Sequence, residues 1–213
     1  MDLWLLAYKI DSIEFLAGRG LSPLKDIVII GGPNGAGKTT AAPAVVPREL
    51  GIREFVNADE IARGLSPFNA QHAAVAAGRL MIERMRALVR SGASFAFETT
   101  CAGRAYIPWL RGCKARGWRV TLLFLWLPTP EAALDRVARR VRQGGHGVPT
   151  DVVIRRWKAG VANMRGLYLP LSDVAVIYDN SDAGRTLIAE RTLGVPLVVH
   201  DALQWAAIEK ASQ

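Results

Sequence analysis

The sequence predicts a three-layer α/β fold, in which helices cover both faces of a parallel, five-stranded core sheet. Short apolar runs alternate along the chain with segments of helical periodicity, the pattern expected of strands that are joined by crossover helices. One run, at residues 118–127, is hydrophobic almost without interruption, as expected for a strand that is covered on both faces. The composition, with half of the 213 residues hydrophobic and 22% charged, is ordinary for a compact globular domain.

Apolar runs predict the strands. The five core strands are predicted at residues 26–31, 53–57, 94–97, 118–127 and 174–178, and short additional strands at 186–189 and 197–200. The first strand runs directly into a glycine-rich turn.

Apolar residues at helical spacing predict four helices between the strands, at residues 38–46, 69–90, 130–142 and 150–169. The first is predicted to stop near Pro47 and the last at Pro170, because proline cannot continue a helix ladder. In the third helix, Ala133, Val137 and Val141 form the inner stripe, and Thr150 is a candidate N-cap of the fourth.

We predict one domain at residues 25–213. Residues 1–24 lie outside the strand and helix pattern, and they form either an amphipathic helix at 3–16 or an ill-placed translation start. No apolar run reaches membrane-spanning length, and the first ten residues make a poor signal peptide, so a cytoplasmic location is expected. Cys101 and Cys113 are expected to be reduced, partly buried thiols, and no zinc site is expected.

The net charge of +8 raises the question of a polyanionic partner. The arginines concentrate between residues 136 and 165, a local cluster that fits the phosphates of a nucleotide at least as well as a polynucleotide.

The strongest motif is GPNGAGKT, a full match to the P-loop pattern, placed between a predicted strand and a predicted helix. Glycines let successive backbone N–H groups surround phosphates, the helix N-terminus favours negative charge, and Lys38 reaches the β- and γ-phosphates. The hydroxyl of Thr39 is a candidate Mg²⁺ ligand. The predicted ATP-binding residues are Gly32, Pro33, Asn34, Gly35, Ala36, Gly37, Lys38, Thr39 and Thr40. The motif makes the predicted fold that of a P-loop NTPase.

Two groups of polar residues follow predicted strands at the edge of the sheet where α/β proteins bind ligands. Asp59 is the candidate catalytic base, although it could instead cap a helix that begins near Glu60, and Glu60 could itself be the base. The second group begins at Glu98, which is placed to contact substrate hydroxyls or a magnesium-bound water, although a turn or a helix cap would use the same residues. The predicted substrate-binding residues are Asn57, Glu60, Glu98, Thr99 and Thr100.

An arginine-rich helix–loop–helix at about residues 136–158 has the form of a nucleotide-kinase lid. Its guanidinium groups would neutralise charge on the transferred phosphoryl group, and Arg139, Arg140 and Arg155 are the chosen candidates. Alternatively, these arginines form only a solvent-exposed basic face of the helices, without a role in catalysis. Asn180, after the fifth strand, is either a contact to the adenine edge or a turn residue.

Together these motifs resemble the zeta toxin-like P-loop kinases, a family of UDP-N-acetylglucosamine kinases. The resemblance covers residues 26–181 and rests on GGPNGAGKTT, FVNADEIA, FAFETT, LFLWLPTPEAALDRVARRVRQGGHGVP and LYLPLSDVAVIYDNS. It implies a fold like that of nucleotide and shikimate kinases. It also implies an enzyme that uses ATP and Mg²⁺ to phosphorylate a small hydroxyl acceptor, with UDP-N-acetylglucosamine as leading candidate. Such proteins are toxins of toxin–antitoxin pairs, so an antitoxin protein is a possible partner.

By motif position, the resemblance places phosphate and Mg²⁺ at Lys38 and Thr39, the base at Asp59, and the acceptor at residues 98–100. The alternative class is a regulatory P-loop ATPase without kinase activity. An ABC-type signature and a guanine-reading NKxD motif are both absent from the sequence. A polynucleotide kinase is a third reading, but no basic strand with interleaved aromatic residues supports it.

Overall fold

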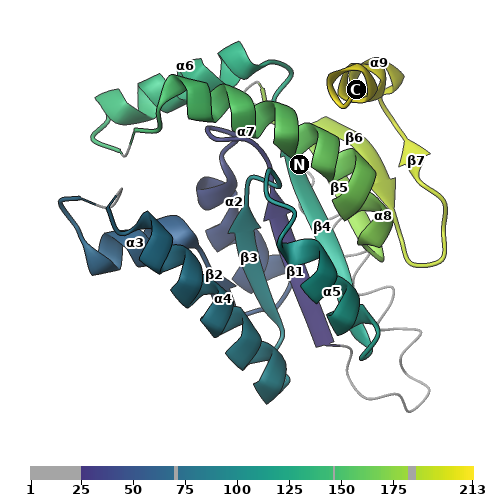
Figure 1. The fold of residues 1–213 in the computed structure, drawn as a ribbon. Helices are drawn as coiled ribbons and strands as arrows, with labels where there is room; N and C mark the ends of the chain where they lie inside the picture. Colours follow the sequence, from purple (N-terminus) through teal and green to yellow (C-terminus); the bar gives the residue numbers. More distant parts are fainter. Residues whose placement is uncertain (1–24, 70–71, 146, 182–185) are drawn as a thin grey trace.

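The computed structural model describes residues 25–213 except 70–71, 146 and 182–185, so the predictions for residues 1–24 lie outside the described part. Seven strands form one sheet in the order β2-β3-β1-β4-β5-β6-β7 (Figure 1). The strands are β1 Lys25–Gly31, β2 Glu54–Val56, β3 Phe95–Thr99, β4 Trp118–Trp126, β5 Val174–Asp179, β6 Thr186–Arg191 and β7 Val198–Val199. The first five are parallel, which confirms the predicted core, and β6 and β7 extend one edge in antiparallel pairing.

Helices lie on both faces of the sheet. The α-helices are α2 Lys38–Ala44, α3 Ala58–Leu65, α4 Ala74–Ser91, α5 Tyr106–Lys114, α6 Pro130–Arg142, α7 Thr150–Asn163, α8 Leu169–Leu171 and α9 Ala202–Ala211. Two π-helical segments, η1 Val45–Glu49 and η2 Met164–Tyr168, extend α2 and α7. Figure 1 shows α4, α5 and α7 in front of the sheet and α2 behind it, which confirms the three-layer α/β class.

Two apolar clusters fill the space between these layers. The larger joins β1, β3, β4 and β5 to α4, α5 and α7, and its largest buried side chains include Phe95, Phe97 and Trp126. The smaller lies on the other face, where Val28 and Ile30 of β1 pack against Ala42 of α2. Among the residues that the structure describes, no helix is long and apolar enough to cross a membrane.

Neither predicted proline stop is correct. Pro47 lies inside η1, where the wider turn pairs the N–H of Leu50 with the carbonyl of Val45 at 3.1 Å. Pro170 lies in the first turn of α8, a position where the missing N–H costs no helix bond. In both places the helix continues past the proline because the pattern of backbone hydrogen bonds changes there.

Further expectations for the helices need correction. Val141 is 46% exposed and does not share the buried stripe of Ala133 and Val137. Thr150 is the first residue of α7 and not its cap, because Pro149 occupies that position. Helices α5 and α9 were not predicted.

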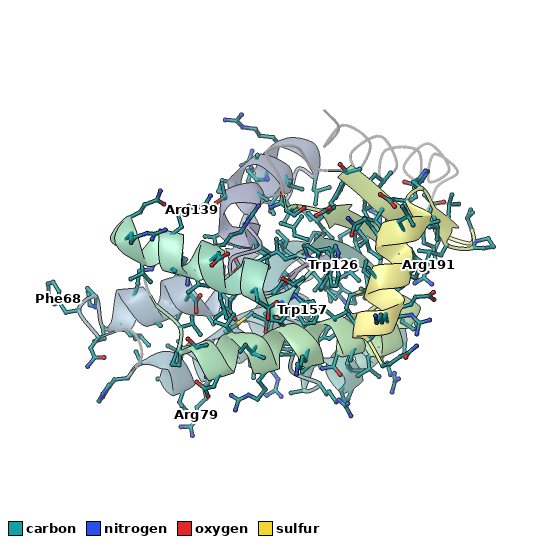
Figure 2. All side chains as sticks on the ribbon, turned by 90° about the horizontal axis from the view of Figure 1, so that it is seen from above. Phe68, Arg79, Trp126, Arg139, Trp157 and Arg191 are labelled. Atoms are coloured by element: carbon teal, nitrogen blue, oxygen red, sulfur yellow. The ribbon has the colours of Figure 1, made fainter. Side chains whose placement is uncertain are left out.

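Helices α6 and α7 form a hairpin at the carboxyl edge of the sheet, in the region predicted as the lid (Figure 1). The side chain of Thr129 caps α6 by accepting from the N–H of Ala132 at 3.1 Å. Trp157 attaches α7 to β4: its Nε1 donates to the carbonyl of Leu127 at 3.0 Å, and its ring packs on Trp126 at 5.5 Å between centroids (Figure 2). This end of the hairpin is therefore fixed to the central sheet.

Candidate functional site

The glycine-rich turn after β1 wraps tightly at the carboxyl edge of the sheet. Gly35 has a φ of 80°, a left-handed conformation that favours glycine. A Cβ on Gly35 would also lie 2.9 Å from the Cβ of Arg136 in α6. Helix α6 thus packs directly on the tip of the loop. Glycine is required at this position for both backbone conformation and space.

Lys38 begins α2 and is buried under the loop, with 6% of its surface exposed. Its Nζ donates to the carbonyl of Pro33 at 2.9 Å and lies 3.6 Å from Oε1 of Glu98. Burial lowers the pKa of Lys38, while the negative charges of Glu98 and Asp59 act in the opposite direction. The ammonium is thus held inside the loop with carboxylates beside it.

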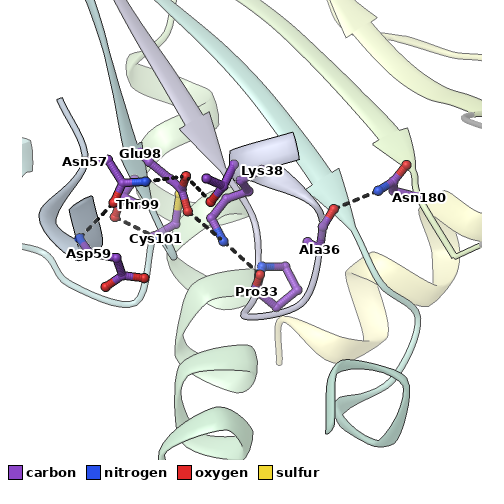
Figure 3. Close-up of polar contacts among 10 residues, drawn as sticks. Pro33, Ala36, Lys38, Asn57, Asp59, Glu98, Thr99, Cys101 and Asn180 are labelled. Carbon is purple, nitrogen blue, oxygen red and sulfur yellow. Dashed lines mark hydrogen bonds and ion pairs between the residues drawn. The ribbon is translucent and has the colours of Figure 1, made fainter. Parts of the chain in front are cut away.

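Glu98 is the centre of the hydrogen-bond network in Figure 3. Its Oε2 accepts from Oγ1 of Thr39 at 2.9 Å and from Nδ2 of Asn57 at 3.0 Å. The network joins three elements: the start of α2, the end of β2 and the end of β3. It brings the predicted phosphate, metal and substrate residues to one place.

The structure answers the capping question at Asp59. Asn57 is the N-cap of α3, and its Oδ1 accepts from the backbone N–H of Asp59 at 2.8 Å. The carboxylate of Asp59 is therefore not the cap. In Figure 3 it lies next to the Glu98 network, and no hydrogen bond is drawn to it. Glu60 is exposed and pairs with Arg63 at 2.8 Å on the same helix.

Asn180 lies on the other side of the loop. Its Nδ2 donates to the carbonyl of Ala36 at 2.7 Å, so part of this side chain supports the loop (Figure 3). Next to it, Arg136 donates to the carbonyl of Ser181 and ties α6 to the segment after β5. Sequence reasoning missed both supporting contacts, which join residues more than 40 positions apart.

The remaining predicted residues are placed as follows. Gly32, Pro33, Asn34 and Ala36 are buried in the loop, Gly37 is half-buried, and Thr40 is exposed on α2. Thr99 and Thr100 are half-buried beyond Glu98, and Oγ1 of Thr99 accepts from the N–H of Cys101 at 3.1 Å.

The lid arginines are the least constrained part of the predicted site. Arg139 and Arg155 are exposed, and Arg140 is half-buried, with an Nε that has no hydrogen-bond partner among the described residues. Figure 2 shows Arg139 on the outer part of α6. The structure does not bring these three guanidinium groups into the Glu98 network.

The loop after β3 is attached to α7 and η2, a feature that the motifs did not indicate. Gly160 lies so close that a Cβ there would be 2.4 Å from the carbonyl oxygen of Thr100. The hydroxyl of Tyr168 donates to the carbonyl of Gly103 at 2.6 Å. Asn163 interrupts the otherwise apolar inner face of α7, and this interruption is the sequence signal that would have marked the contact.

The arrangement has the features of a phosphate and metal site. The glycine-rich turn leads directly into the start of α2 and holds the buried ammonium of Lys38, an arrangement that suits phosphate oxygens. The hydroxyl of Thr39 and the carboxylate of Glu98 are oxygen donors, the type that Mg²⁺ prefers. Among the described residues, no group of three or more histidine, cysteine or acidic side chains is placed to hold a metal ion.

Comparisons with known proteins agree with this architecture. The model of the family AAA_33, described as AAA domain, matches residues 27–167. An uncharacterised protein of Haemophilus influenzae is 29% identical over 126 residues, which are 59% of this chain and 88% of that protein.

Among solved structures, the chain is similar to the AvrRxo1-ORF1:AvrRxo1-ORF2 complex with sulphate ions. The TM-score is 0.69 at 19% identity, and the match covers 99% of this chain and 71% of that one. A structure of the same pair with ATP gives a TM-score of 0.67 at 19% identity over the same shares. The PezAT toxin–antitoxin system of Streptococcus pneumoniae gives 0.58 at 15% identity, over 99% of this chain and 96% of that one. At these identities the likeness concerns the fold alone, which is that of a P-loop NTPase.

Proposed function

Since the chain belongs to the AAA_33 family, described as AAA domain, and has a P-loop kinase-like fold, we propose that it is an ATP- and Mg²⁺-dependent phosphotransferase. The acceptor in this proposal is a hydroxyl group of a small molecule. One observation carries it: Glu98 joins the P-loop residues Lys38 and Thr39 to the segment that presents Asp59. Phosphate residues and a candidate base thus stand side by side, as transfer to a hydroxyl requires.

In this mechanism the backbone of residues 32–37 and Lys38 hold the β- and γ-phosphates. The acceptor oxygen attacks the γ-phosphorus, the bond from the γ-phosphorus to the β–γ bridging oxygen breaks, and ADP leaves. Lys38 neutralises negative charge that spreads over the transferred phosphoryl group. Mg²⁺ would supply further positive charge at the phosphates, held by Thr39 with Glu98 behind it. Asp59 orients the acceptor hydroxyl and takes its proton. Asn57 fixes the start of α3 and with it the position of Asp59.

The other predicted residues take supporting parts. Thr99 and Thr100 line the acceptor side, and Asn180 holds the loop beside the adenine. Arg139, Arg140 and Arg155 would reach the γ-phosphate only if the hairpin of α6 and α7 moved inward. Gly35 packs directly against α6, so we place this movement at the outer part of the hairpin.

UDP-N-acetylglucosamine is the leading acceptor candidate, and an antitoxin protein is the candidate partner. Two observations support both: the motif resemblance to zeta toxin-like kinases, and the fold likeness to the PezAT toxin–antitoxin system. Use of ATP is also supported by the similar AvrRxo1 complex, whose structure contains ATP.

The test is phosphate transfer from ATP by the purified protein, against a panel of hydroxyl compounds led by UDP-N-acetylglucosamine. We expect a phosphorylated acceptor with the wild-type protein and none with Lys38→Ala. A control variant, Arg90→Ala on the exposed face of α4, should retain full activity. ATP hydrolysis without transfer to any compound would contradict the kinase proposal and support the regulatory ATPase alternative.

A further inference from the structure

Arg104, in the loop between β3 and α5, is an exposed arginine with a fixed base. Its Nε donates to Oδ1 of Asn163 at 3.1 Å. Asn163 is only 3% exposed, and its Nδ2 donates to the carbonyls of Cys101 at 3.1 Å and Ala102 at 2.9 Å. Rotating the amide by 180° would place oxygen against two carbonyls, so Asn163 has one favourable orientation. That orientation fixes the direction in which the Arg104 side chain leaves the loop.

The outer nitrogens of Arg104 have no acidic partner in the described part of the chain. Among residues 25–213 as the structure describes them, no carboxylate forms an ion pair with Arg104. Four other arginines do pair with an acid, namely Arg63, Arg84, Arg119 and Arg165. A guanidinium that is held at Nε and unpaired at its outer nitrogens is prepared for a planar anion such as a carboxylate or a phosphate.

The loop that carries Arg104 borders the proposed acceptor side of the site. It begins directly after β3, in which Glu98 is the last residue but one, and α7 holds it on one side. Two residues after Arg104, at the start of α5, the hydroxyl of Tyr106 contacts Sδ of Met81 in α4 at 3.7 Å. The loop and the start of α5 therefore connect α7 with α4, and α4 packs against α3, the helix of Asp59. We therefore place the acceptor side of the proposed site along this loop.

We propose that Arg104 binds an anionic group of the acceptor, remote from the hydroxyl that is phosphorylated, and that Asn163 positions Arg104 for this contact. The inference rests on the proposed kinase function and narrows its acceptor class. Hydroxyl compounds that carry a phosphate or carboxylate are preferred over neutral sugars and alcohols.

Binding is measured on the full chain by calorimetry, with the P-loop first saturated by Mg²⁺ and a non-hydrolysable ATP analogue. This saturation prevents the probes from binding at the P-loop. The probes are UDP-N-acetylglucosamine for phosphate, glucuronate for carboxylate, and N-acetylglucosamine as the neutral compound. We expect Arg104→Gln to weaken binding of the preferred anionic probe by about 10- to 100-fold, the usual effect of losing a charge-assisted contact. The neutral probe should bind equally weakly to both proteins.

The matched control is Arg116→Gln. Arg116 is also exposed and also held through Nε by a neutral oxygen, the carbonyl of Gly112 at 3.0 Å, but it lies after α5 at the opposite edge of the sheet. Its replacement should leave the affinity of every probe unchanged. Asn163→Ala tests positioning: it should raise the Kd, and in turnover the KM, of the anionic probe, while the affinity for the ATP analogue stays unchanged. A purely structural role of Asn163 would change all affinities together.

Two outcomes overturn the inference. One is equal affinity of the wild-type protein and Arg104→Gln for both anionic probes, including no binding of either. The other is an equal loss for the neutral probe. If anion binding depends on Arg104 but no compound is phosphorylated, the inference stands and the kinase proposal fails. If phosphate transfer occurs and the Arg104→Gln substitution does not affect it, the kinase proposal holds and the inference about Arg104 fails.

Discussion

Glu98 accepts from two donors with one oxygen and lies near the Lys38 ammonium with the other. Its side chain is only 10% exposed, so the carboxylate has lost most of its water and depends on these contacts. The same contacts fix three backbone segments relative to one another. At the scale of single residues, the site is organised around this carboxylate rather than around Asp59, although Asp59 is the candidate base.

Asp59 and Glu60 can be separated by substitution. We expect Asp59→Asn to lower kcat by about 10²- to 10⁴-fold, because an amide cannot accept the hydroxyl proton. Glu60→Gln should change kcat by less than about tenfold, since Glu60 is exposed and engaged with Arg63. Steady-state transfer kinetics measure both. A larger loss in Glu60→Gln than in Asp59→Asn would reassign the base.

The thiol of Cys101 should be inert. Burial raises the pKa of Cys101 from 9.0 to about 12, partly opposed by the Lys38 charge and by a backbone hydrogen bond from Gly32. Native protein should therefore react with iodoacetamide at pH 8.5 at Cys101 far more slowly than unfolded protein, as peptide mass spectrometry would show. Rapid native labelling would show that the cysteine is accessible.

The same shift makes stability depend on pH. A folded pKa above the unfolded value contributes stability that is complete below pH 9 and is lost as pH rises toward 12. Urea unfolding of the wild-type protein should show this decline, and Cys101→Ala should show less of it.

At the scale of elements, α7 and η2 determine the shape of the loop after β3. Direct approach of Gly160, the amide of Asn163 and the hydroxyl of Tyr168 together hold four consecutive carbonyls, those of residues 100–103. Tyr168 is the last residue of η2, so the wider π-helical turn leads up to its position at the loop. In the proposed function, helix α7 therefore borders the acceptor side as well as forming part of the predicted lid.

Two helical glycines make this contact testable. Gly160→Ala places a methyl group 2.4 Å from a backbone oxygen and should destabilise the fold by about 1–3 kcal/mol, as overpacking does. Gly78→Ala in α4 meets nothing within 4 Å and should stabilise by about 0.5–1 kcal/mol. Urea denaturation of the two variants gives the comparison. Similar stability of both would mean that α7 and the loop separate easily.

The features of the fold that were predicted best are those that a few consecutive residues encode. The P-loop and the five parallel strands were predictable because motif and periodicity each occupy a few consecutive residues. Helices α5 and α9 were missed because their apolar stripes are short. The helix ends predicted at Pro47 and Pro170 were wrong because the backbone hydrogen-bond pattern of a helix can change type around a proline.

The site was predictable only in part. The lysine, threonine and acidic residues could be named from motifs, but their partners could not. Asn57 and Glu98 are 41 positions apart, and Arg104 and Asn163 are 59 apart. Which side chains meet over such separations is decided by strand order and by helix packing.

At the scale of the whole molecule, the strand order explains why these residues meet. The P-loop strand β1 lies between β3 and β4, and β5 follows β4, so carboxyl ends of parallel strands flank the loop on both sides. Glu98 comes from one side and Asn180 from the other. A ligand in the loop therefore lies between segments that follow several strands of the sheet. Its binding should stabilise the whole domain against unfolding and not the loop alone.

ATP with Mg²⁺ should accordingly raise the unfolding temperature. At a concentration 100 times its Kd, a ligand stabilises the native state by about 2.7 kcal/mol, which for a domain of this size is roughly 5–10 °C. Differential scanning fluorimetry measures the shift, and Lys38→Ala should abolish it. An equal shift in that variant would place ATP elsewhere.

The position of β1 in the sheet also has a consequence for protein synthesis. Ile27 pairs with Phe95 on one side and with Val120 on the other, so β1 leaves the ribosome long before either neighbour exists. At normal elongation rates, about 5–20 s pass before β4 has been made. Until then an apolar strand with two unpaired edges is exposed, and such a segment is a target for chaperones. A nascent chain that ends before β4 therefore has the complete P-loop sequence but no nucleotide site.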